Sequence, residues 1–367
     1  MNRDVPRKPS NDEPKLETSV EKLDGETVAK RASRRAIAIL IALALACIVL
    51  SVISLMLGRY PISPHQAITM IGSTFLPIDV TWSDQEAAVF FNVRLPRIAL
   101  ALLVGCCLSA AGAAFQGTFQ NPLVSPDILG VSQGAAFGAA VAILLGFASF
   151  GISLMAFLFA LVTVTLVVVI AQVAHGNQVL TVVLAGVMVS SLFSAGVSFA
   201  KLVADPSNQL PAITYWLMGS LTGASVHDVQ IVIVPMLIGL VVLFALRWRI
   251  NILTMGDDEA ATMGVNTQRL RIIIIAAATL VTASSVAVTG MIGWVGLVIP
   301  HLCRMLIGSD YRRLIPASML MGAGFLLLVD DVSRLISTAE IPIGILTAFI
   351  GAPFFLYLIV RQGRERL

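Results

Sequence analysis

Apolar residues along this chain form long runs that are separated by short polar stretches. A helix that crosses a bilayer needs roughly 20 consecutive apolar residues, and ten runs fit this requirement or come close to it. They lie at 36–57, 90–117, 126–147, 150–173, 178–202, 228–247, 270–290, 293–308, 313–336 and 342–361. The eighth run is short and contains Pro300, so we expect it to be tilted or only partly spanning. The pattern predicts an all-α, polytopic membrane protein with about ten transmembrane helices.

The first 35 residues differ sharply from the rest of the chain. They hold 16 of its 45 charged side chains, although the mean hydropathy of the whole chain is +0.91 and only 12% of its residues are charged. A segment this polar cannot bury an apolar core. We therefore predict a disordered cytoplasmic tail at 1–35 and a transmembrane domain at 36–367.

Basic residues give the orientation of the predicted spans. If both termini are cytoplasmic, thirteen Lys and Arg residues flank the inner edges of the spans and five flank the outer edges. The inner set is Lys30, Arg31, Arg34, Arg35, Arg247, Arg249, Arg269, Arg271, Arg312, Arg313, Arg361, Arg364 and Arg366; the outer set is Arg59, Arg94, Arg97, Lys201 and Arg334. Basic residues accumulate on the cytoplasmic side of membrane proteins. This bias predicts a multi-pass membrane protein with both termini on the cytoplasmic side.

Residues 290–304 carry three glycines, a proline, a histidine and an arginine where a membrane helix usually has Leu or Val. Such residues weaken a helix or add polar groups that hydrocarbon cannot satisfy. They favour a helix bundle with a pathway through it, and therefore a transport protein. His301 has no second ligand nearby, and the four cysteines form no CxxC pattern. We expect neither a metal site nor a disulfide framework.

Two arginines and a proline form the motif Arg94-Leu-Pro-Arg97 at the outer end of the second predicted span. Paired guanidinium groups suit the carboxylates of a docking protein or an anionic ligand. The alternative is that the two side chains extend to the lipid headgroups. Arg334, at the outer end of another predicted span, would add to the same surface.

The stretch 119–127 is polar and contains two prolines, and the assigned topology places it on the cytoplasmic side. It is either part of an inner gate or an ordinary stiff loop, since Asn-Pro and Ser-Pro favour turns.

Three acidic residues begin a second cytoplasmic feature, which lies in the loop predicted at 248–269. They favour the N-terminal end of a short helix, and the residues that follow form a compact surface that could enter a groove of a partner. The segment consists of Gly256, Asp257, Asp258, Glu259, Ala260, Ala261, Thr262, Met263, Gly264, Val265 and Asn266. The alternative is a solvated linker helix.

Asp330 and Asp331 lie deep in the ninth predicted span, where carboxylates are costly unless they face the bundle interior or a water-filled cavity. They would serve as the relay of a proton-coupled secondary transporter, which is a competing interpretation. The chain has no G-x-x-x-x-G-K-[ST] sequence, so it cannot hydrolyse ATP by the P-loop route. No nucleophile–base constellation is present either. We predict a transport protein that is not an enzyme.

Several motifs in order resemble the permease subunits of bacterial ABC importers for iron–siderophore complexes, haem and vitamin B12. They are Arg94–Arg97, Gly112 through Asn121-Pro122-Leu123 to Gly134, Tyr215–Gly219, Met263–Asn266, Gly290 through His301, and Ile341-Pro-Ile-Gly344 through Gly351-Ala-Pro-Phe354. The resemblance covers about residues 40–362. The double acid Asp330-Asp331 and the long polar tail depart from the family pattern.

The resemblance implies a permease domain that works as a homodimer, or as a heterodimer with a paralogous permease, with the pore at the subunit interface. It implies two ATP-binding subunits, which would hold the ATP and magnesium, and a periplasmic or lipid-anchored substrate-binding protein; this chain would bind no cofactor and no nucleic acid. Arg94, Arg97 and Arg334 would dock the binding protein, and Asn121, Leu123 and Thr181 would form the cytoplasmic gate. The 256–266 segment would be the coupling helix. Iron–siderophore is the expected cargo, with haem or cobalamin as alternatives.

Overall fold

The computed structural model describes residues 13–58, 60, 62–73, 80, 82–174, 178–337 and 339–364, and this part of the chain contains helices and no strand. The elements in chain order are α1 (Glu13–Met56), α2 (Pro64–Ser73), α3 (Asp84–Ala88), the π-helical turn η1 (Val89–Arg94), α4 (Leu95–Thr118), the 3-10 turn η2 (Pro126–Leu129), α5 (Val131–Leu144), α6 (Ser149–Val173), α7 (Gln178–Val203), α8 (Gln209–Met218), α9 (Val226–Leu253), α10 (Asp257–Thr262), α11 (Thr267–Thr289), α12 (Val295–Ile307), α13 (Tyr311–Ile336) and α14 (Ile343–Arg364).

Within the described residues, seven helices are long and apolar enough to cross a membrane: the segment Ser33–Met56 of α1, the continuous helix Asp84–Thr118 and the helices α6, α7, α9, α11 and α13. Three shorter apolar helices, α5, α12 and the segment Ile343–Tyr357 of α14, complete the set. Each of the ten corresponds to one predicted span. The prediction of an all-α, polytopic membrane protein is confirmed.

Helix α4 forms the centre of the bundle, in contact with α9, α11, α12 and α13. Small residues allow this close packing, because helices in lipid associate where their backbones can approach. A Cβ atom on Gly105 would lie 2.2 Å from the carbonyl oxygen of Gly322, and one on Gly112 would lie 1.8 Å from that of Gly296. These two contacts fix α13 and α12 against the central helix.

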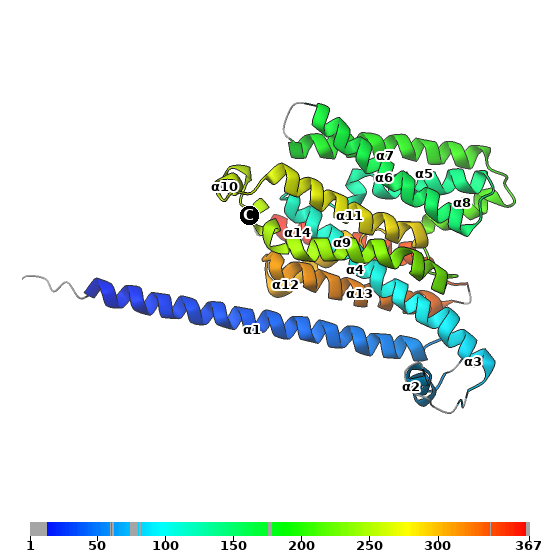
Figure 1. The fold of residues 1–367 in the computed structure, drawn as a ribbon, viewed down its shortest axis with the longest axis horizontal. Helices are drawn as coiled ribbons and strands as arrows, with labels where there is room; N and C mark the ends of the chain where they lie inside the picture. The colour runs from blue at the N-terminus through cyan, green and yellow to red at the C-terminus, as the bar shows by residue number, and fades with distance from the viewer. Residues whose placement is uncertain are drawn as a thin grey trace, which may run out of the picture.

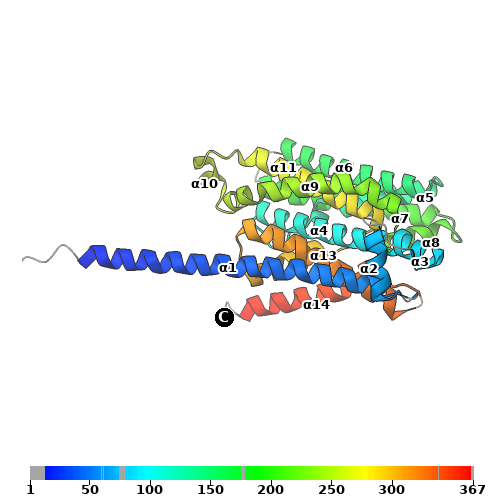
Figure 2. The same cartoon turned by 60° about the horizontal axis from the view of Figure 1, so that its bottom comes forward.

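The helices run roughly along one axis, and the short connecting elements gather at its two ends (Figure 1). The end that carries α10 is also the end at which the C-terminus lies, on the other side of the bundle in Figure 2; at the opposite end lie α2, α3 and α8. Figure 2 shows α14 on the same side of α4 as α1 and α13, away from α6 and α7. The basic residues assigned to the cytoplasm place the α10 end inside the cell and the α8 end outside, an orientation that stays a prediction.

Several details differ from the sequence prediction, and three of them are described here. Helix α9 continues to Leu253, so the connection that carries α10 begins at 254 rather than at 248, and it ends where α11 begins at Thr267. The predicted span 126–147 is divided by Gly130, whose φ of +80° ends η2 before α5 starts. The short helix α2 was not predicted; it begins at a capping box in which Ser63 and Gln66 exchange hydrogen bonds.

Helix α1 reaches back to Glu13, into the predicted polar tail, and its first half extends well beyond the other helices (Figure 1). A lone helix that packs against nothing is marginal in water, so disorder of the 1–35 tail stays a prediction. Residues 1–12 lie outside the described part of the chain, as does Arg59 of the outer basic set.

Candidate functional site

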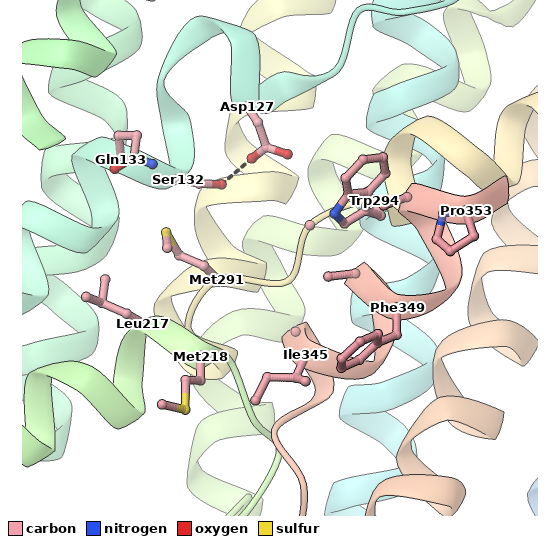
Figure 3. Close-up of a pocket in the computed structure, with 14 residues that line it drawn as sticks. Asp127, Ser132, Gln133, Leu217, Met218, Met291, Trp294, Ile345, Phe349 and Pro353 are labelled. Carbon is pink, nitrogen blue, oxygen red and sulfur yellow. Dashed lines mark hydrogen bonds between the residues drawn. The ribbon is translucent and has the colours of Figure 1, made fainter. Parts of the chain in front are cut away.

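A groove of about 740 Å³ lies between α14, the end of α8, the 290–294 connection and the η2–α5 corner (Figure 3). Its walls are mostly apolar and include the side chains of Met218, Met291, Trp294 and Phe349. Polar groups come from one wall, where the Ser132 hydroxyl donates a hydrogen bond to the Asp127 carboxylate. The groove therefore combines apolar walls with a small polar cluster, as binding sites commonly do.

One wall of the groove is a stretch of backbone that is not helical. Between α11 and α12 the chain passes through residues 290–294, and Trp294 has a φ of +70°, which is unusual for a residue with a side chain. The indole lies against α14, where a Cβ on Gly351 would be 2.5 Å from the Trp294 Cβ. Non-helical backbone at membrane depth is tolerated where it is buried in protein or lines a water-filled cavity. The 290–294 connection thus marks this groove as a site of function.

The opposite wall contains the second interrupted helix. Gly130, at the start of α5, packs against Thr163 and Ser190, which lie near the middle of α6 and α7. Helix α5 therefore begins deep within the bundle, and α12 also begins deep, with Gly296 against Gly112. Two short helices that begin at mid-depth and flank one cavity are typical of the substrate pathway in transporters.

Helix α10 lies at the end of the bundle that is predicted to be cytoplasmic, and it is held by three features. Its Ala260 is fully buried, and Arg271 of α11 binds the Asp257 carboxylate through both terminal nitrogens, at 2.9 and 2.7 Å. The helix ends in a glycine turn, in which the amide of Val265 donates to the carbonyl of Ala260. Met263 at its end is 55% exposed. Helix α10 thus exposes three acids at its start, and Ala261, Thr262 and Met263 towards its end, from a rigid corner.

The predicted gate residues lie on two neighbouring segments. Asn121 and Leu123 belong to the exposed turn after α4, where the amide of Leu123 donates to the Asn121 side chain at 2.9 Å. Thr181 lies on the first turn of α7. Phe119, just before the turn, shares a small cavity with Val179 and Val182 of α7. The two predicted gate segments therefore border one small cavity, and their role as a gate stays a prediction.

The predicted docking arginines lie near the C-terminal end of α1, where Arg94 and Arg97 are buried and the Arg334 side chain is 9% exposed. Arg94 donates to the carbonyls of Leu55 and Tyr60, and Arg334 donates to those of Ser54 and Leu57. Cations at the last carbonyls of a helix complement its dipole. In this structure, Arg94 and Arg334 cap α1 rather than extend to lipid or to solvent.

The two carboxylates in α13 form ion pairs with two of the docking arginines, which the sequence analysis did not predict. Arg97 binds Asp330 through Nε, at 3.0 Å to both oxygens, and through Nη2 at 2.9 Å; Nη1 reaches Glu340 at 2.9 Å. Arg334 pairs with Asp331. The expectation that the aspartates face the bundle interior is correct. Their pairing with arginines supports a structural role and leaves the proton relay without an observation in its favour.

This bundle, with its interrupted helices around a groove, defines a polytopic transport protein. A sequence model of the FecCD transport family matches residues 37–361, and the chain belongs to that family. The molybdate import system permease protein of Haemophilus influenzae is 41% identical over 326 residues, which cover 89% of this chain and 96% of the relative. A probable iron chelatin transport system permease protein of Helicobacter pylori is 39% identical over 322 residues, covering 87% and 97%.

Among solved structures, the chain is similar to a metal-chelate type ABC transporter in an inward-facing conformation. The TM-score is 0.79 and the identity 41%, over 88% of this chain and 99% of that chain. The resemblance inferred from the motifs is confirmed. The chain is a multi-pass inner-membrane permease of the ABC-importer type, a transport subunit rather than a catalytic one.

Proposed function

We propose that this chain is half of the membrane pore of a binding-protein-dependent importer that moves an iron–siderophore complex inward. Two copies, or this chain and a paralogous permease, form the pore at their interface. Two ATP-binding subunits dock at the α10 end, and a periplasmic or lipid-anchored binding protein docks at the α8 end. Both termini are cytoplasmic.

The observation that carries this proposal is α10, a short helix anchored at its base and exposed at its tip. Its fixed orientation, through Arg271 and the buried Ala260, allows a push on Met263 to move the inner ends of α9 and α11. A solvated linker, the alternative weighed from the sequence, needs neither the buried alanine nor the bidentate ion pair. The segment 256–266 therefore suits coupling to an ATPase.

The groove supports a bulky chelate as cargo. None of its fourteen lining residues is Lys or Arg, and two are methionines. An oxyanion such as molybdate would pass these apolar walls without a cation to offset its lost hydration. A siderophore complex buries its metal and presents an organic surface. The identity to a molybdate permease makes molybdate the second candidate, beside haem and cobalamin.

The gate and the docking surface complete the proposal. Asn121, Leu123 and Thr181 would close the pathway at its inner end. Arg94, Arg97 and Arg334 would meet acidic groups of the binding protein. Because each arginine already has hydrogen-bond acceptors within this chain, docking requires that some of these acceptors be replaced. Carboxylates from outside must exchange with Glu340, whose side chain is 25% exposed, or with the carbonyls at the end of α1.

Growth tests identify the cargo. A deletion strain is grown under iron restriction with ferric siderophores or haem, and under molybdate or cobalamin limitation in parallel. We expect loss of growth on one ferric siderophore, restored by the intact gene. Normal growth on every iron source, together with a defect on molybdate or cobalamin, would overturn the choice of cargo while leaving the importer architecture.

The coupling role has its own test. Met263→Asp places a charge on the exposed tip of α10, where it removes apolar contact with the ATPase. We expect the purified complex to lose ATPase stimulation by the binding protein while the permease stays assembled. Thr262→Ser, on the same exposed helix, serves as the matched control. Unchanged stimulation in Met263→Asp would contradict the assignment of α10.

A further inference from the structure

Arg271 is buried although it lies at the inner end of α11. It is 5% exposed, and its two terminal nitrogens hold the Asp257 carboxylate of α10. That carboxylate is on the surface, with 53% of its side chain exposed. The third donor of the guanidinium, Nε, is buried and has no hydrogen-bond partner. The side chain therefore reaches from the interior to the base of α10.

The same side chain also lies beside a small cavity next to the predicted gate. Arg271 lines a cavity of about 20 Å³ together with Phe119, Val179 and Val182. Phe119 lies two residues before Asn121, and the two valines are close to Thr181 on α7. The Arg271 side chain thus joins α10 through an ion pair and lines the same cavity as residues next to both predicted gate segments.

The corner between α10 and α11 is stiff enough to carry a movement. The amides of Gly264 and Val265 close the end of α10 on the carbonyls of Ala261 and Ala260, and the Asn266 side chain accepts a hydrogen bond from the amide of Arg269 at the start of α11. Helix caps of this kind fix the direction of the chain. A displacement of α10 therefore carries the first turns of α11, and Arg271 with them.

Stability alone does not explain this arrangement. A buried cation loses its hydration, and a buried donor without a partner adds a further cost. An aliphatic side chain would fill the same space with neither cost. A buried polar group left unsatisfied in a well-packed region calls for a specific reason, and the position of Arg271 between α10 and the gate provides one.

We propose that Arg271 is a positioning residue that transmits the movement of α10 to the gate segments at 119–123 and 179–182, with Asp257 as its attachment to α10. This inference rests on the function proposed above for α10 and the gate. It adds the identity of the connecting group: without the Arg271–Asp257 pair, the ATPase still docks and turns over, but the gate does not respond.

The test uses the complete transporter in lipid nanodiscs, with the four native cysteines replaced by alanine and Leu123→Cys as a reporter on the exposed turn. A membrane-impermeant maleimide measures the labelling rate of this cysteine without nucleotide and in the vanadate-trapped state. ATPase activity is measured on the same samples. The variants are Arg271→Gln, Asp257→Asn and the exchange Arg271→Asp/Asp257→Arg. Arg312→Gln, which breaks an ion pair whose arginine is 59% exposed, is the matched control.

In the reporter chain and in Arg312→Gln, we expect the labelling rate to change with nucleotide state. Arg271→Gln should keep basal ATPase activity and lose that change in labelling rate, and Asp257→Asn should lose the change in labelling rate as well. Because Asp257 is on the surface, Asp257→Asn tests the pair even if Arg271→Gln fails to assemble. A nucleotide-dependent change that persists in Asp257→Asn would overturn the inference alone. A reporter chain whose labelling never responds to nucleotide would instead overturn the proposed gate, and the inference with it.

Discussion

The ion pair between Arg97 and Asp330 provides the sharpest test of how the outer end is held together. Asp330 is fully buried and the Arg97 side chain is 9% exposed. Replacing Asp330 by Ala leaves a guanidinium in a low-dielectric setting with one remaining acid. Breaking a buried pair by removing one partner costs about 3–5 kcal/mol. Because Glu340 still binds Nη1, we expect the lower end, about 3 kcal/mol.

The assay is unfolding by SDS in mixed micelles, followed by circular dichroism, with the free energy of unfolding compared between variants. A loss of about 3 kcal/mol lowers the ratio of folded to unfolded protein by roughly 150-fold. The double variant Arg97→Met/Asp330→Leu removes both charges and keeps apolar volume, so we expect it to be more stable than Asp330→Ala. Arg312→Gln, on the exposed pair, should cost less than about 1 kcal/mol.

Two results would refute this reasoning. One is a loss below about 1 kcal/mol for Asp330→Ala, which would mean that water reaches the pair. The other is a double variant whose loss of stability equals the sum of the losses in the two single variants, because two residues that interact should deviate from additivity. The double variant also separates two roles of Arg97: a stable protein with weakened binding-protein association would support docking.

The remaining predictions concern packing and pH. Gly112→Val should prevent assembly of the bundle, since its Cβ would meet the Gly296 carbonyl at 1.8 Å, whereas Gly293→Ala, with no atom within 4 Å, should unfold like wild type in a thermal assay. Burial acts to raise the pKa of the Asp310 carboxyl, but hydrogen bonds from Asn251 and from Arg312 outweigh it and hold this pKa below 3.8. Ionised Asp310 therefore stabilises the folded protein at pH values above the pKa of this group in the unfolded chain, and this stabilisation is lost as the pH falls through the pKa in the folded protein. We expect Asp310→Asn to weaken the loss of stability at acidic pH in a profile of stability against pH.

The spans could be predicted because the bilayer imposes a length and an apolar composition on each of them. The run at 270–290 was placed within three residues of α11, and α10 was recognised from its acids and its glycine. Helix α9 was underestimated because Trp248 and Ile250 continue it past the arginines at 247 and 249. Charged residues end a membrane span without ending its helix.

The partners of the outer arginines could not be predicted from the sequence. Arg97 and Asp330 are separated by 233 positions, and no local pattern links them; only the packing of α4 on α13, through Gly105 and Gly322, brings them together. The positive φ of Trp294 could not be predicted from the sequence either. Its neighbours 290 and 293 are glycines, which made the break in the helix evident but not the conformation of the tryptophan.

The two ends of the subunit carry buried arginines of different character, and this difference predicts where the subunit moves. At the outer end, separating Arg97 from Asp330 would leave a fully buried carboxylate without its cation, which is costly. At the inner end, the Asp257 side chain is half exposed, so the intact Arg271–Asp257 pair can shift together with α10 while the carboxylate stays in contact with water. We therefore expect the outer ends of α1, α4 and α13 to move as one rigid unit, while α10 and the gate turn rearrange. Movement driven from the ATPase side would then open the pathway first at Leu123, the residue where the labelling experiment measures it.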